Sequence, residues 1–360
     1  MKYEILAVVG LLFCLIVIAF EYFIHYRFAE QQDEKEANTR MINHRMKIRI
    51  EGVLYAPTKV SRDSEIKKMA EEINNDYEIY EAVIRIIESV KERVDEDEKQ
   101  SLSKLIERVN DEVNPVSIYA SMLEMRDVYH KGYAMRKLAD LGAKQYRDIM
   151  IEHSKSKNRD LAYNAAMALA KLGDEENVAV FLKSIQNDRL YSSRIINEFF
   201  DEFEGDRASL AKLLFADCNT YMRSVIIKAI TPYKIEEFHK MYIENCASKD
   251  FQLKVACVKA IATFGNKDDE QILQIAAQDN EWVVRISAVR GLALINTPTA
   301  LASVKKALRD KEWWVRQAAA NAITQMDISP RDLEDILGGY DRYAADAIKG
   351  VLYKKLDSLQ

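Results

Sequence analysis

The longest apolar stretch of the chain lies at its N-terminus. From Ile5 to Phe20 every residue is apolar or glycine, and three further apolar residues prolong the stretch after Glu21. At a rise of 1.5 Å per residue, roughly 20 residues of helix span about 30 Å, which matches the hydrocarbon core of a bilayer. The pattern predicts one transmembrane helix over residues 1–27.

A cleaved signal peptide is the alternative for this stretch. The apolar core of a signal peptide would be shorter, and small residues would occupy positions −3 and −1 before the cleavage site. If Ala29 stood at position −1, the large Arg27 would stand at position −3. Only Lys2 precedes the stretch, while several basic residues follow it, namely Arg27, Lys35, Arg40 and Arg45. The excess of basic residues predicts a single-pass protein of the cell membrane with its C-terminal part in the cytoplasm.

Two further segments separate this stretch from the main body of the chain. Residues 28–60 are strongly charged and lack a steady apolar period, so we predict a juxtamembrane linker that Pro57 terminates. Apolar residues then recur at three- and four-residue steps over Ile66–Val94 and Leu102–Val113, which predicts a helical hairpin within residues 61–113. The hairpin either begins the repeats that follow or forms a dimerising coiled segment.

A fixed period dominates the rest of the chain. Apolar-basic pairs begin at Met222, Leu253, Val284 and Val315, each 31 residues after the last. Each unit reads as two helices, here called helix A and helix B, and the pairs lie in helix B. A step of 100° per residue places offsets 0, 4, 8 and 11 from each pair on one face. In one repeat these positions are Val284, Ala288, Leu292 and Ile295.

One helix pair cannot bury such a face alone, so neighbouring pairs must stack. The sequence therefore predicts an all-α fold over residues 114–360, preceded by one transmembrane helix. The segments that show the pattern best are DNEWVVRISAVRGL at 279–292 and DKEWWVRQAAANAI at 310–323. They resemble the HEAT repeat family, in the short bacterial form also found in phycobilin-lyase-like proteins. The resemblance implies a right-handed α-α superhelix and leaves the activity open.

Composition and charge narrow the function classes. The net charge of −5 and pI near 5.8 argue against a general attraction to nucleic acid, so we expect no nucleic-acid partner. The histidines and cysteines lack metal-ligand spacing, and no phosphate-binding glycine loop or nucleophile elbow occurs. We therefore expect no catalytic residues, no cofactor and no metal.

Three recurring columns are candidate sites. The first is a charged column in which an Asp precedes three of four basic residues by six positions. The resemblance implies ion-pair ladders between adjacent repeats for it. Its members are Arg223, Lys254, Arg285 and Arg316, with Asp217, Asp279 and Asp310. The second column is aromatic, with Phe251, Trp282, Trp313 and the adjacent Trp314. We weigh packing between repeats against partner binding for these rings and favour packing.

The third column lies opposite the core face of helix B. Offset 6 from each pair gives Lys228, Lys259, Arg290 and Asn321, and offset 2 gives Ser224, Val255, Ile286 and Gln317. In the HEAT family helix B lines the concave side, so Val255, Lys259, Ile286 and Arg290 are expected to form a mixed apolar and basic groove. Such a groove suits an acidic helix or an extended peptide. A merely solvated face is the alternative.

These observations favour a membrane-anchored scaffold or adaptor that holds a partner protein. Two alternatives stay open. One is a HEAT-type enzyme of the bilin-lyase kind, and the other is a homo-oligomeric membrane organiser built on the hairpin at residues 61–113.

Overall fold

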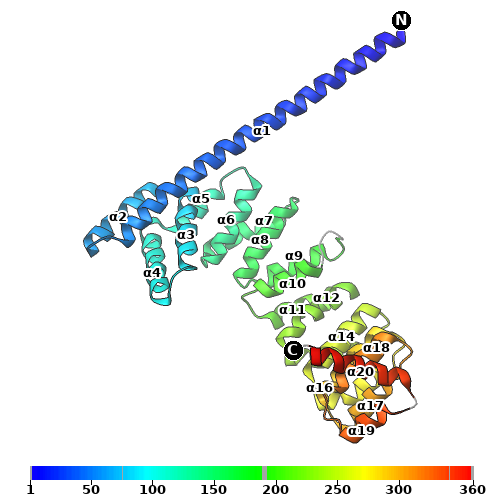
Figure 1. The fold of residues 1–360 in the computed structure, drawn as a ribbon. Helices are drawn as coiled ribbons and strands as arrows, with labels where there is room; N and C mark the ends of the chain where they lie inside the picture. Colours follow the sequence, from blue (N-terminus) through cyan, green and yellow to red (C-terminus); the bar gives the residue numbers. More distant parts are fainter. Residues whose placement is uncertain (1, 75, 189–192, 340, 358–360) are drawn as a thin grey trace. The chain divides into compact units, whose positions relative to one another are not determined.

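The computed structural model describes the backbone of residues 2–74, 76–188, 193–339 and 341–357 (Figure 1). The regular secondary structure in these ranges consists of α-helices and 3₁₀-helices, without strands. The chain divides into two compact units, Met1–Ala134 and Met135–Gln360. The predicted all-α class is confirmed for the described residues.

The first unit consists of five helices and the start of a sixth. They are α1 (Lys2–Leu54), α2 (Lys59–Ile73), α3 (Tyr77–Lys91), α4 (Glu96–Val113), α5 (Pro115–Met122) and α6 (Val128–Asp140). The C-terminal part of α1 packs on α2 and α3, which both contact α4. This unit thus surrounds its core with helices that differ in length and lack a common repeat.

Helix α1 differs from the linker expected over residues 28–60. It is one continuous helix to Leu54, and Met46, Ile50 and Val53 are buried at helical steps of four and three residues. Arg49 lies between them on the sequence and forms ion pairs with Glu65 and with Glu72 of α2. In the sequence, residues 46–50 alternate between apolar and basic residues, which does not indicate an amphipathic helix. The apolar face becomes recognisable only in the structure, where α2 packs against α1.

The predicted hairpin at residues 61–113 also differs, because the structure has three helices there. Helix α2 ends at Asn74, which adopts φ 36° in the left-handed region. Asp76 then caps α3, and its Oδ1 accepts hydrogen bonds from the backbone N–H of Glu78 at 2.8 Å and of Ile79 at 3.3 Å. An Asn and an Asp within the apolar run Ile66–Val94 are turn and capping residues, so a signal for the break was present.

From Lys2 onward, the predicted transmembrane segment at residues 1–27 lies in α1. Most of its side chains, those of residues 2–16 among them, lie outside the described residues. Where side chains are described, none of the helices combines the length and the hydropathy needed to cross a bilayer. The membrane segment therefore stays a prediction.

The second unit is a row of helix pairs. After α6 its helices are α7 (Arg147–Ser154), α8 (Arg159–Lys171), α9 (Glu175–Ile185), α10 (Ser193–Glu202), α11 (Arg207–Asp217), α12 (Thr220–Ile230), α13 (His239–Asn245), α14 (Phe251–Phe264), α15 (Glu270–Ala276), α16 (Trp282–Ile295), α17 (Pro298–Ala307), α18 (Trp313–Ile323), α19 (Pro330–Leu337) and α20 (Arg342–Asp357). Short 3₁₀ turns occupy Lys144–Tyr146, Thr231–Tyr233, Glu236–Phe238 and Lys267–Asp269.

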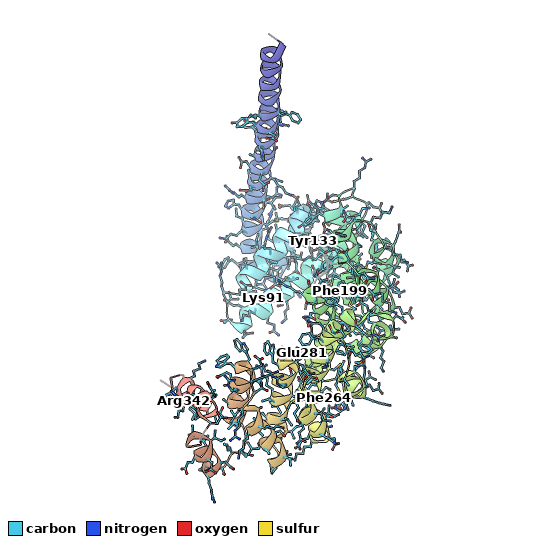
Figure 2. The ribbon with its side chains drawn as sticks, turned by 90° about the vertical axis from the view of Figure 1, so that its right-hand side faces the viewer. Lys91, Tyr133, Phe199, Phe264, Glu281 and Arg342 are labelled. Carbon is cyan, nitrogen blue, oxygen red and sulfur yellow. The ribbon has the colours of Figure 1, made fainter. Side chains whose placement is uncertain are left out.

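The even-numbered helices from α8 to α20 correspond to helix B. Each contacts the next even-numbered helix, and α14, α16, α18 and α20 each contact the odd-numbered helix before them. Figure 2 labels Phe199 in α10, Phe264 at the end of α14 and Glu281 just before α16, three positions within this row. The helical-repeat architecture that the 31-residue period predicts is therefore present in the second unit.

The predicted core face of helix B is buried. Val284, Ala288, Leu292 and Ile295 are at most 4% exposed. Gly291 of α16 lies so close to α14 that a Cβ atom there would stand 2.7 Å from the Cβ of Ala262. Small residues therefore permit the close stacking of neighbouring B helices.

Candidate protein-binding surface on the B helices

The aromatic column and the basic residues of the third column, Lys228, Lys259 and Arg290, lie on one surface. Phe251, Trp282 and Trp313 are the first residues of α14, α16 and α18. In α14 and α16 the basic residue, Lys259 or Arg290, follows the aromatic one by eight positions, and eight positions correspond to little more than two helical turns. The two columns, which the sequence presented as separate candidates, thus form two rows of a single B-helix surface.

The aromatic row is substantially exposed. Phe251, Trp282, Trp313 and Trp314 are 39%, 40%, 52% and 58% exposed. The rings of Trp313 and Trp314 meet edge to face with centroids 4.6 Å apart, which is a contact within one helix. Because each ring stands at the N-terminal end of its helix, the next repeat covers it only in part. The structure thus leaves much of these rings available, in contrast to the packing role that the sequence favoured.

The basic row carries uncompensated charge. Lys228, Lys259 and Arg290 are exposed, and in the part of the chain that the structure describes none of them forms an ion pair. Lys228 Nζ donates a hydrogen bond of 3.3 Å to Gln252 Oε1. Partial burial and then the charge of Lys259 lower the pKa of Lys228. The ammonium groups of Lys228 and Lys259, on the neighbouring helices α12 and α14, therefore repel each other.

One predicted member of the groove is wrong. Val255 is only 5% exposed, because offset 2 of α14 lies among the neighbouring B helices α12 and α16. Ile286, at the same offset in α16, is half-buried, and Leu294, eight residues after it, is 64% exposed. Leu294 was missed, although it follows Arg290 by the same four-residue step that relates Arg290 to Ile286. The apolar part of the surface thus comes from Ile286, Leu294 and the aromatic row.

The charged column forms a ladder between repeats, as expected from the resemblance. Lys254 Nζ lies 3.0 Å from Asp279 Oδ2, and Lys183 Nζ lies 2.6 Å from Asp217 Oδ2. Arg285 binds Asp310 through two hydrogen bonds of 2.7 Å, from Nε and Nη2. These cations stabilise the stack, and they are distinct from the unpaired cations of the B-helix surface.

The Arg285–Asp310 pair is nearly buried, with 6% and 13% of the two side chains exposed. Burial alone raises the pKa of Asp310, but the hydrogen bonds from Arg285 and from the Glu312 N–H outweigh it and hold the pKa below its ordinary value. Two members of the column depart from the ladder. Arg223 donates to the carbonyl of Ala216, and Arg316 donates to the carbonyl of Asp310.

The described residues contain no group of three or more His, Cys, Asp or Glu side chains arranged to hold a metal ion. The surface on the B helices offers rings, alkyl groups and cations, and such groups bind another molecule by contact and charge.

Comparison with known proteins identifies the repeat. Residues 270–352 match the family described as HEAT repeats, which confirms the resemblance over this range. No curated protein matches the chain. Among solved structures, an engineered protein is 13% identical, with 87% of this chain and 98% of that chain covered and a TM-score of 0.36. The complex of CpcE and CpcF of phycocyanin lyase from Nostoc sp. PCC7120 is 15% identical, with 65% and 94% covered and a TM-score of 0.30.

Proposed function

Since residues 270–352 match the HEAT repeat family, we propose that the chain is a protein-binding scaffold whose B-helix surface holds an acidic segment of a partner. The observation that supports this proposal is the unpaired basic row of Lys228, Lys259 and Arg290 beside the exposed aromatic row. Other cations of the second unit, such as Lys254 and Arg285, are neutralised within the stack.

The dimensions of the stack suggest the form of the partner. Packed helices lie about 8–10 Å apart, so a segment that crosses α14, α16 and α18 spans about 20 Å. An extended chain covers this distance with about six residues. We expect acidic side chains about three residues apart, facing Lys259 and Arg290, and apolar side chains that contact Trp282, Trp313 and Ile286.

The test is a selection of peptides from a random library on the purified full-length chain. We expect enrichment of peptides with two acidic residues at this spacing and at least one large apolar residue. Affinity for an enriched peptide is then measured for Lys259→Glu combined with Arg290→Glu. The double variant loses two favourable charge contacts with the peptide, which together contribute about 2 kcal/mol to the binding free energy. This loss corresponds to roughly thirtyfold weaker binding.

The matched control is Lys267→Glu combined with Arg331→Glu. It makes the same chemical change at exposed positions next to helix A elements, before α15 and at the start of α19. We expect the control to bind as the unmodified chain does. Selection of peptides without acidic residues, or equal loss of binding in both double variants, contradicts the proposal.

We further propose that residues 1–27 anchor this scaffold in the cell membrane, with the C-terminal part in the cytoplasm. The apolar run Ile5–Phe20 and the basic residues after it support this proposal. The full-length chain should stay in the membrane pellet after alkaline extraction, and Leu11→Lys with Leu12→Lys should release it. Release of the unmodified chain contradicts the anchor and leaves the binding surface unaffected.

A further inference from the structure

The first unit contains a cavity that neither the repeat nor the scaffold function uses. It has a volume of about 330 Å³ and lies between α1, α3 and α6. Figure 2 labels Tyr133 of α6, which lines the cavity, and Lys91 at the end of α3. Its lining includes charged and aromatic side chains, namely Lys35, Tyr77, Glu81, Arg85, Tyr129 and Tyr133. All of them belong to Met1–Ala134.

The carboxylates of this cavity already have hydrogen-bond donors. Tyr119 and Tyr133 both donate to Glu81 Oε1, at 2.5 and 2.6 Å. The hydroxyl of Tyr77 donates to Glu78 Oε1 at 3.2 Å. Burial and then the Glu81 carboxylate raise the pKa of Tyr119 and of Tyr133, which keeps both hydroxyls protonated as donors. Hydroxyl donors of the protein therefore already occupy acceptor positions on both carboxylates of the wall.

The imidazole of His130 is held in place as well. Its Nδ1 lies 2.5 Å from Asp127 Oδ2, and hydrogen bonds to His130 lower the pKa of Asp127. An ionised carboxylate only accepts, so Nδ1 carries a proton. The other nitrogen, Nε2, lies 2.7 Å from the Tyr77 hydroxyl. His130 thus forms part of the rigid wall.

The cations of the cavity, in contrast, lack carboxylate partners. Arg85 makes one long hydrogen bond, 3.5 Å from Nη2 to Asn43 Oδ1. Neither Arg85 nor Lys35 forms an ion pair with any side chain that the structure describes. They come from different helices, α3 and α1, and line the same cavity. Arg85 and Lys35 are therefore the charged groups of the cavity that a ligand anion can pair with.

Aromatic rings form the adjoining wall. The rings of Tyr129 and Tyr133 are nearly parallel, with an interplanar angle of 15° and centroids 6.5 Å apart. Tyr129 is 74% exposed, and its ring stands at 87° to that of His130. An exposed ring beside a cation is a surface on which a flat ring can stack.

We propose that this cavity binds a small aromatic carboxylate. The ligand ring contacts Tyr129 and Tyr133, and its carboxylate pairs with Arg85 and Lys35. A guanidinium binds a carboxylate through two parallel hydrogen bonds, which favours this anion over a monatomic one. The volume lies at the lower end of ligand pockets, about 300–1,000 Å³, and therefore suits a ligand with a single ring.

The test uses the full-length chain, in the detergent from which it is purified, and four probes of similar size. Fluorine NMR with 4-fluorobenzoate reports binding, and benzoate, benzylamine and cyclohexanecarboxylate are tested as competitors. We expect 4-fluorobenzoate to bind and benzylamine not to displace it, because benzylamine has the same ring and the opposite charge. Cyclohexanecarboxylate, which keeps the charge without the flat ring, should compete several-fold less well than benzoate.

Variants separate the two walls. Arg85→Gln should weaken 4-fluorobenzoate binding at least about tenfold, because the charge-assisted hydrogen bonds are lost. Tyr129→Leu should weaken it by roughly threefold to tenfold, because the stacked ring is removed. Both side chains are exposed, and circular dichroism checks that the variants fold.

Arg93→Gln and Tyr55→Leu are the matched controls, since both positions are exposed in the same unit and line no part of the cavity. We expect both to bind as the unmodified chain does. Absence of binding at millimolar probe, displacement by benzylamine as effective as by benzoate, or unchanged affinity of Arg85→Gln overturns the proposal. The probe comparison uses the unmodified chain, so the proposal stays testable if a variant does not fold.

Discussion

The two units of the chain satisfy their charged groups in different ways. In the second unit one arrangement recurs, and Lys254 and Arg285 each bind an Asp that lies 25 residues later in the sequence. In the first unit each contact is of its own kind, as with Arg49 and Glu72, Arg108 and Asp63, or Tyr119 and Glu81. A repeated contact is visible as a period in the sequence, whereas a unique contact has no second copy to reveal it.

The difference also bears on stability. Each repeat contacts only its neighbours, so a lost ladder pair weakens one interface of the stack. The Glu81 carboxylate instead receives hydroxyls from two positions of the chain, Tyr119 and Tyr133, which lie 38 and 52 residues away. The following predictions test this comparison by breaking one element of either unit at a time.

The largest effect is expected for Arg285→Ala. The substitution leaves the largely buried Asp310 carboxylate without its partner, and such losses cost about 3 kcal/mol. Arg316→Ala is the control within the same column, because Arg316 contacts backbone carbonyls and the Tyr343 ring in place of a carboxylate. Urea unfolding measures the free energy of unfolding of both variants. Equal losses would show that the Arg285–Asp310 ion pair stabilises the fold no more than the contacts of Arg316 do.

Gly291→Ala should destabilise the stack by about 2 kcal/mol. The added Cβ would lie 2.7 Å from the Cβ atom and 2.8 Å from the Cα atom of Ala262, so α14 and α16 must move apart. Gly350→Ala in α20 is the control, since nothing lies within 4 Å of a Cβ there. It should stabilise by about 0.5–1 kcal/mol through helix propensity alone. A stabilising Gly291→Ala contradicts the close packing of the B helices.

In the first unit, Tyr119→Phe should cost more stability than Tyr80→Phe. The two rings are equally buried, at 3% and 4% exposure. The Tyr119 hydroxyl donates to the Glu81 carboxylate, whereas the Tyr80 hydroxyl donates to the amide oxygen of Asn110 at 2.9 Å. Hydrogen bonds to charged acceptors contribute about 2 kcal/mol and those to neutral acceptors about 1 kcal/mol. Thermal unfolding of both variants measures the difference, and a larger loss for Tyr80→Phe contradicts the proposed network.

A smaller effect is expected from acid. Hydrogen bonds and the charge of Arg285 hold the pKa of folded Asp310 below the ordinary value of 3.8, although burial opposes them. A lowered folded-state pKa stabilises the fold at every pH above the ordinary pKa of the group. This stabilisation is lost as the pH falls from the ordinary pKa through the lower folded-state pKa. The unfolding midpoint should therefore drop as the pH falls below about 4, and Asp310→Asn should show a flatter profile there. An equally steep profile in Asp310→Asn contradicts this assignment.

Much of the second unit could be predicted because its information is local and repeated. Thr297 caps α17 and Pro298 is its first residue, both of which are typical of a helix start, and the Thr297 hydroxyl accepts from the Ala300 N–H at 3.0 Å. The burial of Val284 and Leu292 follows from helical spacing. In the first unit the signals were weaker. The face of α1 that carries Met46 and Ile50 is short, and the polar break at Asn74 and Asp76 was masked by apolar residues on both sides.

By itself, the sequence determined the helical class, the 31-residue period and the buried columns, because each depends on neighbours along a helix or one repeat away. The ion-pair ladder was expected only from the resemblance to HEAT repeats. Only the tertiary structure decided which surface positions stay open. Val255 and Ile286 share an offset, yet α12 and α16 bury the first and leave the second half-exposed. The tyrosine hydroxyls around Glu81 were likewise assembled by helices distant in sequence. Exposure depends on what the neighbouring element places over a side chain, and the side chain's own sequence context does not contain that information.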